Sequence, residues 1–230
     1  MPPEDPVIER MQALLRQWQA AADAKAVFLG CYQLMTSSTL GAVRRSEFHD
    51  SAWVDRLLHR FADYYFVALE AHTRDPATAP SVWQGAFAAA ADSRVLPLQH
   101  LLLGVNAHIN YDLVLTLVEV LRPEWASLSA EQRAARYADH CRINAVIART
   151  IDSVQDQVLA PAMPSLPLAD ALLGRLDERL ASGLITRWRE TVWTNTQRLL
   201  DARGGDQAQP ILIEVEAEAL RLGHLIGLHV

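Results

Sequence analysis

The sequence predicts an all-α protein, a single-domain bundle of about eight helices around a central apolar helix near residues 97–121. Three observations predict this fold class. Apolar residues recur at three- and four-residue steps along most of the chain, which is the period of a helix that buries one face. No strand-like alternation of any length is present. Half of the 230 residues are hydrophobic and 21% are charged, as in folded rather than disordered chains.

Helix boundaries follow from periodicity, caps and breakers. Asp50 is expected to cap the third helix, and Pro97 to occupy the first turn of the central one. Capping-box spacing occurs twice, at Ser81 with Gln84 and at Ser129 with Gln132. Proline and glycine residues mark the expected breaks, among them Pro123, Gly183 and the Gly204–Gly205 pair. The helices are expected over residues 7–25, 27–45, 50–72, 81–92, 97–121, 129–160, 168–182, 184–202 and 210–230.

The segment 161–167 contains three prolines in seven residues and is predicted to be a linker. It would separate a main bundle from a C-terminal helical cap at 168–230. We expect both parts to pack into one body, so residues 1–230 are interpreted as one domain.

Composition and missing motifs exclude several functions. A net charge of −6 without a basic patch argues against a nucleic-acid partner. No uninterrupted apolar run of transmembrane length occurs, and the first residues do not resemble a signal peptide, so a cytoplasmic protein without a membrane span is expected. Cys31 and Cys141 lie far apart and are interpreted as small buried residues rather than a disulfide framework. No P-loop or dinucleotide fingerprint is present, so no nucleotide cofactor is expected.

The predicted central helix carries the most informative polar residues. Two rows of polar or small residues follow it at four-residue steps, one made of His100, Gly104, His108, Asp112 and Thr116, the other of Asn106 and Asn110. Polar groups inside an apolar helix need partners or a cavity. His108 and Asp112, one turn apart, could act as an acid–base pair or bind a divalent metal ion. The alternative is a structural hydrogen-bond network without any chemistry.

Other polar residues are weaker candidates. His100, Asn106, Asn110 and Asn144 are expected to contact substrate. Further metal ligands could come from the third helix and the residues before it, namely His49, His59, Asp63 and His72. For the third helix we favour a solvated face with internal ion pairs, and Asp50 beside His49 is more simply a helix cap.

The run Leu103-Gly104-Val105-Asn106-Ala107-His108-Ile109-Asn110-Tyr111-Asp112-Leu113 resembles the signature of a bacterial all-helical family known only as a domain of unknown function. Similar stretches occur from Phe28 to Thr36 and from Phe48 to Leu69, and the resemblance covers most of residues 25–200. It implies a helical domain with His108, Asn110 and Asp112 as marked positions. It implies no reaction, cofactor or substrate.

These observations lead to three hypotheses of function. The first is an enzyme that acts on a small, largely apolar metabolite, such as one of secondary metabolism, through His108 and Asp112. The second is a non-catalytic binding or interaction protein, in which no cavity would reach His108. The third is a carrier of an apolar ligand. Four tryptophans are open to interpretation as a homodimer surface or as core, namely Trp18, Trp125, Trp188 and Trp193.

Overall fold

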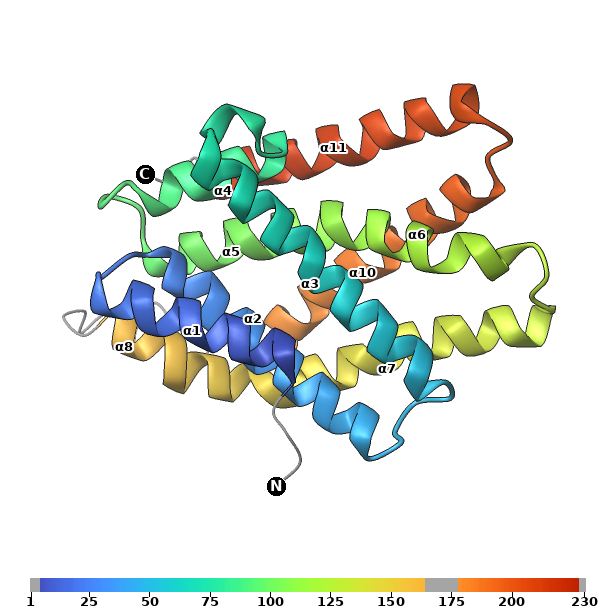
Figure 1. The fold of residues 1–230 in the computed structure, drawn as a ribbon, viewed down its shortest axis with the longest axis horizontal. Coiled ribbons are helices and arrows are strands. Elements are labelled where there is room, and N and C mark those ends of the chain that lie inside the picture. Colours follow the sequence, from blue (N-terminus) through green and yellow to red (C-terminus); the bar gives the residue numbers. More distant parts are fainter. Residues whose placement is uncertain (1–4, 164–177, 228–230) are drawn as a thin grey trace.

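The computed structural model describes residues 5–163 and 178–227, and every regular element within these ranges is helical (Figure 1). The predicted all-α class is therefore confirmed. In chain order the elements are α1 (Pro6–Ala20), α2 (Lys25–Arg44), α3 (Ser51–Arg74), the 3-10 turn η1 (Pro76–Thr78), α4 (Ser81–Ala90), α5 (Pro97–Ala107), the π turn η2 (His108–Asp112), α6 (Leu113–Trp125), α7 (Ala130–Val154), the π turn η3 (Gln155–Leu159), α8 (Ala160–Ala162), α10 (Glu178–Asp201) and α11 (Gly205–Gly227).

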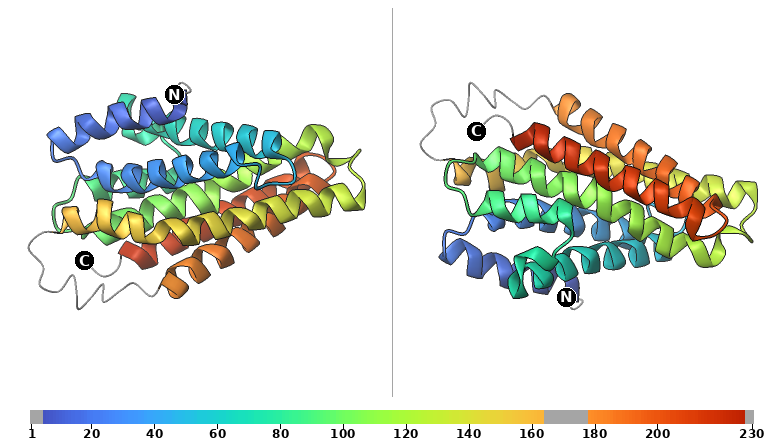
Figure 2. Two further views of the ribbon diagram at one scale, coloured as in Figure 1. Left: turned by 90° about the horizontal axis from the view of Figure 1, so that it is seen from below. Right: turned by 90° about the horizontal axis from the view of Figure 1, so that it is seen from above.

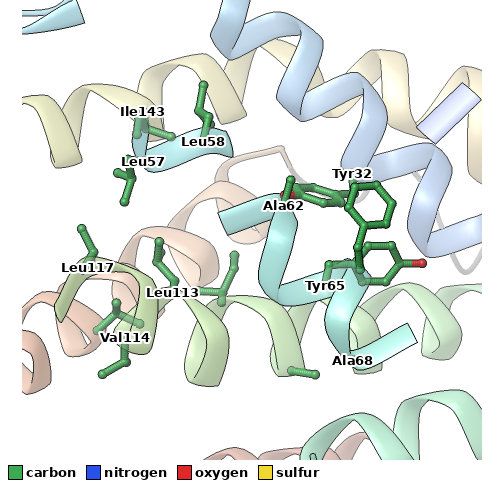
Figure 3. Packing of buried hydrophobic residues seen from close by; sticks show 14 of the residues in the cluster. Tyr32, Leu57, Leu58, Ala62, Tyr65, Ala68, Leu113, Val114, Leu117 and Ile143 are labelled. Carbon is green, nitrogen blue, oxygen red and sulfur yellow. The ribbon is translucent and has the colours of Figure 1, made fainter. Parts of the chain in front are cut away.

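The elements α5, η2 and α6 form one continuous helix, the central rod, at the predicted position. It contacts α2, α3, α4, α10 and α11, so it is covered from several sides. In Figure 2 the central rod lies between α1 and α3 on one side and α10 and α11 on the other. Its residues Leu113, Val114 and Leu117 are at most 2% exposed, and Figure 3 shows them in the interior together with leucines of α3. The all-round apolar sequence of this rod is explained by burial on all sides.

Two of the expected caps are present. The Asp50 side chain accepts a hydrogen bond of 2.9 Å from the backbone of Trp53. Ser129 and Gln132 form the predicted capping box, in which each side chain binds the other residue's backbone N–H at 3.2 and 2.8 Å. These bonds satisfy N–H groups that have no partner inside the helix.

The other predicted capping box is wrong. The cap residue of α4 is Pro80, and Ser81 is already the first helical residue. Gln84 instead donates to the carbonyl oxygens of Ala77 and Ala79, at 3.1 and 2.8 Å. Its side chain therefore closes the turn before the helix rather than capping the helix.

Several expected helix breaks are also wrong. Pro123 lies inside the last turn of α6, and α10 continues through Gly183. An exposed helical glycine costs only about 1 kcal/mol, which the surrounding packing offsets. Helix α11 begins at Gly205, ahead of the expected Pro210. Helix α1 ends earlier than predicted because Ala22 adopts a left-handed backbone with φ of 51°.

The C-terminal helices share the main core. Helix α10 packs against α6 and α7, and α11 packs against α4, α5 and α10. Residues 164–177 lie outside the described ranges, and with them most of the predicted linker and the start of the helix expected at 168–182. Three of the four tryptophans considered for a dimer surface, Trp18, Trp125 and Trp193, are at most 7% exposed and belong to the core.

Two helical stretches, Lys25–Arg44 and Pro97–Trp125, are long and apolar enough to cross a membrane, with mean hydropathies of 1.2 and 1.4 over their most apolar windows. We expected no such stretch from the absence of an uninterrupted apolar run. Within the fold, 50% and 61% of these windows are buried. The core helix of a soluble protein has the same length and composition, so the values carry no argument for a span. The cytoplasmic location stays a prediction.

Gly104 determines how closely α2 approaches the central rod. The space that its missing side chain leaves is filled by Phe28, and a Cβ at position 104 would approach the Cβ of Phe28 to 2.9 Å and overlap its ring. By contrast, a Cβ at Gly85 in α4 would meet no heavy atom within 4 Å. The two glycines therefore form a matched pair, one packed and one open.

We expect Gly104→Ala to lower the free energy of unfolding by about 1–3 kcal/mol, the usual cost of overpacking a core. We expect Gly85→Ala to raise it by about 0.5–1 kcal/mol, because alanine restricts the unfolded chain and favours the helix. Urea denaturation of the two variants measures both effects. A neutral or stabilising Gly104→Ala would contradict the close packing of Phe28 on the central rod.

Candidate functional site

The predicted polar pair lies in the π turn of the central rod. Within η2 the N–H of Leu113 donates to the carbonyl of His108, five residues earlier, instead of the four of an α-helix. Such a turn inserts one extra residue and changes the direction of the side chains around it, and π turns are frequent at functional sites. His108 and Asp112 are the first and last residues of this turn.

His108 and Asp112 form a buried hydrogen-bonded pair, called here the His–Asp pair. The distance between His108 Nδ1 and Asp112 Oδ2 is 2.9 Å, and the two residues are 2% and 1% exposed. Trp83 of α4 donates its Nε1–H to the same Asp112 oxygen, also at 2.9 Å. Two N–H donors on one oxygen fit an ionised carboxylate. With its proton on Nδ1, the imidazole presents an unprotonated Nε2.

The Nε2 atom of His108 is buried and has no hydrogen-bond partner among the described residues. Aromatic side chains surround the imidazole instead. The Phe61 ring stacks on it with centroids 3.5 Å apart and planes 8° apart, and the Tyr32 ring meets it edge-on at 4.4 Å. Phe28, Tyr65 and Trp83 complete the enclosure at centroid distances from 5.9 to 6.1 Å. The ring is thereby fixed, and its Nε2 lies without a hydrogen-bond partner among these aromatic side chains.

Burial determines the protonation of the pair. It lowers the pKa of His108, against the opposing effect of the Asp112 carboxylate. It raises the pKa of Asp112, against the opposing hydrogen bonds from His108 and Trp83. A lowered imidazole pKa keeps His108 neutral around pH 7, which is the state a general base requires.

His108 lines an internal cavity of about 350 Å³, the central cavity. Its wall comes from α2, α3, the central rod, α7, η3 and α10, and most of it is aliphatic or aromatic. At the start of α10 the wall includes Leu180 and Leu184, which are 72% and 42% exposed, so the cavity reaches the surface there. The polar side chains in the wall are Tyr32, Thr36, Thr39, His108, Gln155 and Arg189.

Two hydroxyl groups on residues of this wall are fully buried. The hydroxyls of Tyr32 and Thr36, one turn apart on α2, interact with each other, and neither makes a hydrogen bond to a third group among the described residues. Together with His108 Nε2 they are three fully buried polar atoms on residues that line the cavity. Buried polar groups without partners are costly, and a ligand or ordered water would relieve that cost.

Arg189, like Tyr32 and Thr36, lines the cavity but was not among the residues predicted from sequence. It lies on α10, is 4% exposed, and donates from Nε to Asn144 Oδ1 at 2.6 Å and from Nη2 to the His140 carbonyl at 2.8 Å. Burial lowers its pKa to about 10. In sequence Arg189 is one arginine among several on an amphipathic helix. Only the packing of α10 against α7 shows that it is buried.

The four residues expected to contact substrate lie elsewhere. Asn106 donates to the carbonyl of Ala219 in α11 at 2.8 Å and accepts from Asn110 at 2.9 Å. His100 is buried two turns before His108, outside the wall of the central cavity. Asn144 accepts a hydrogen bond from Arg189 and so helps to orient this residue of the cavity wall. Asn106 lines a second pocket, between α4, α5 and α11, and Asn144 is the nearest of the four to the central cavity, so their contact with a substrate stays a prediction.

The four additional metal candidates do not converge on the His–Asp pair. His49 is exposed in the α2–α3 loop, and Asp63 is exposed in an ion pair with Arg60 at 3.2 Å. His59 contacts Asp5 at 3.2 Å, and the ring of His72 packs against Phe87. Across residues 5–163 and 178–227, no three His, Cys, Asp or Glu side chains come close enough to share a metal ion. The four-residue spacing of α3 is explained by its solvated face.

Comparison with known proteins gives one result. Residues 5–228 match the family described as a family of unknown function, DUF5995. The chain belongs to the DUF5995 family. The resemblance inferred from the sequence is thereby confirmed at the level of the family, and the His–Asp pair and Arg189 lie inside the matched range. No curated protein and no solved structure matches the chain.

We expect Trp83→Phe to lower the free energy of unfolding more than Trp53→Phe does, with a difference of about 1–3 kcal/mol. Only the Trp83 substitution removes a hydrogen bond to a buried carboxylate. Trp53 is a matched control, since it is fully buried and its Nε1 has no partner among the described residues. Urea denaturation of both variants isolates the hydrogen bond from the shared loss of ring volume. Equal losses would show that Trp83 does not hold Asp112.

Proposed function

We propose that this protein is an enzyme that binds a small, largely apolar molecule in the central cavity and moves a proton on it with the His–Asp pair. The observation that carries the proposal is that His108 lines an apolar cavity with an unpartnered Nε2, while Asp112 holds its Nδ1 at 2.9 Å. The same arrangement of an oriented imidazole and a buried carboxylate is common in general base catalysis.

Each residue has a defined part in this proposal. The neutral His108 accepts a proton at Nε2, and Asp112 stabilises the imidazolium that forms. Trp83 keeps the carboxylate oriented, as a residue that acts through Asp112. The Tyr32 and Thr36 hydroxyls are placed to hydrogen-bond an oxygen of the bound molecule. The aromatic enclosure keeps water from the ring, which strengthens these electrostatic effects.

The hypothesis that the His–Asp pair binds a metal ion has less support than the acid–base hypothesis. One oxygen of Asp112 already accepts two N–H groups, and no third ligand side chain stands nearby in the described ranges. A stable metal site needs three or more protein ligands as a rule. We therefore propose the acid–base form.

A carrier of an apolar ligand is the second candidate. It is favoured by the wall itself, in which the aliphatic and aromatic side chains far outnumber the polar ones. Cys31, the thiol in this wall, is no nucleophile, because burial raises its pKa to about 12. The hypothesis of an interaction protein has less support, because it expected no cavity at His108 and His108 is among the residues that line the central cavity.

A general base in an apolar cavity can be tested before the natural substrate is known. The Kemp elimination of 5-nitrobenzisoxazole requires only that a base remove the C3 proton while the N–O bond breaks, which gives a coloured cyanonitrophenolate. We expect the wild type to exceed His108→Gln by about 100-fold in rate, the usual contribution of a general base. The rate should fall at acid pH with an apparent pKa below 6.5, because burial lowers the pKa of His108.

The exposed His49 supplies the control, and His49→Gln should keep the wild-type rate. Asp112→Asn should lose most of the rate, because the amide stabilises the imidazolium less well. A wild-type rate equal to that of His108→Gln would contradict the acid–base role. Binding of the benzisoxazole without turnover would then favour the carrier.

A further inference from the structure

The charges of the central cavity indicate what kind of molecule it binds. Arg189 is the single charged side chain among the described residues of the wall. The other polar side chains there are hydroxyls, an amide and the imidazole, which burial keeps neutral. The wall therefore carries one positive charge and no negative one.

Arg189 has no carboxylate partner among the described residues. No Asp or Glu of residues 5–163 and 178–227 forms an ion pair with it. The charge of the nearby Glu190 favours the charged guanidinium without a direct ion pair, because its carboxylate accepts from the Tyr137 hydroxyl at 2.7 Å and from the Cys141 thiol at 3.6 Å. The partners of Arg189 are neutral, namely the Asn144 amide oxygen and the backbone and ring of His140. A buried guanidinium with only neutral partners is unusual, because burying a charge is costly without a counter-charge.

The bonds that Arg189 does make also orient it. Nε is bound to Asn144, and Nη2 is bound to His140, so both bonds tie the guanidinium to α7. Nη1 makes no hydrogen bond to any described residue. It is also not one of the fully buried side-chain atoms that lack a partner. A guanidinium held by two of its nitrogens is preorganised to donate from the third.

We propose that the molecule bound in the central cavity is an amphipathic monocarboxylic acid, whose carboxylate pairs with Arg189 and whose apolar body fills the rest of the cavity. This inference rests on the proposed binding of an apolar molecule and names its chemical class. One negative charge neutralises the wall, whereas a dianion would leave a buried excess charge. The body of the acid then lies along the aliphatic wall that also contains His108, Tyr32 and Thr36.

The experiment compares decanoic acid with 1-decanol as competitors of a neutral fluorescent probe, N-phenyl-1-naphthylamine, bound to the full-length protein. We expect the acid to bind at least about tenfold more tightly, since a desolvated charge pair is worth more than 1.4 kcal/mol. Equal affinities, or failure of decanoic acid to displace the probe, would overturn the inference. This comparison uses the wild type alone, so it does not depend on whether a variant folds.

Variants then assign the preference to Arg189. Arg189→Met should remove the preference for the acid while leaving the affinity for 1-decanol within about threefold. The exposed Arg187, on the same helix, is the matched control, and Arg187→Met should keep the preference. A preference that persists in folded Arg189→Met would overturn the assignment.

The two proposals fail in different ways. Loss of the carboxylate preference together with a retained Kemp elimination would contradict the ligand class alone. A retained preference without His108-dependent elimination would contradict the acid–base role and leave a carrier of amphipathic acids.

Discussion

The structure depends on how an ionised side chain is accommodated inside an apolar helix. Asp112 is 1% exposed in the most buried rod of the bundle, and its carboxylate is satisfied by N–H donors from His108 and Trp83. A buried carboxylate without such donors would cost several kcal/mol. The π turn brings His108 into reach, and the packing of α4 against α5 brings Trp83. The arrangement of α4 and the central rod is therefore tied to this one group.

The same arrangement leaves the other side of the imidazole unsatisfied. Phe61 and Tyr32 pack against the ring of His108 but offer no hydrogen bond to its Nε2. On α10, Arg189 is hydrogen-bonded to α7 and forms no ion pair with a described carboxylate. The imidazole and the guanidinium both belong to residues of the central cavity wall, and this shared position is the basis of the proposal that the cavity holds a bound molecule. Neither group would be expected in a wall whose only purpose was packing.

The sequence predicted the elements whose signals are local. The central rod and the caps at Asp50 and Ser129 depend on residues a few positions apart, and so does the pairing of His108 with Asp112. Breaks were overpredicted because Pro123 and Gly183 are tolerated where packing outweighs propensity. The cavity could not be predicted, because Arg189 and His108 are 81 positions apart and meet through the packing of α10. Periodicity also does not show that α11 packs against the face of the rod that contains Asn106.

The most direct test of the central claim is the protonation of the His108 ring in the folded protein. Nitrogen-15 NMR of the imidazole at pH 7 distinguishes the two neutral tautomers, and the His108 signals are assigned with His108→Gln. We expect Nδ1 to carry the proton, Nε2 to be unprotonated, and the Nε2 resonance to shift when N-phenyl-1-naphthylamine is added. A proton on Nε2, or a resonance that the probe leaves unchanged, would contradict a base that faces the central cavity.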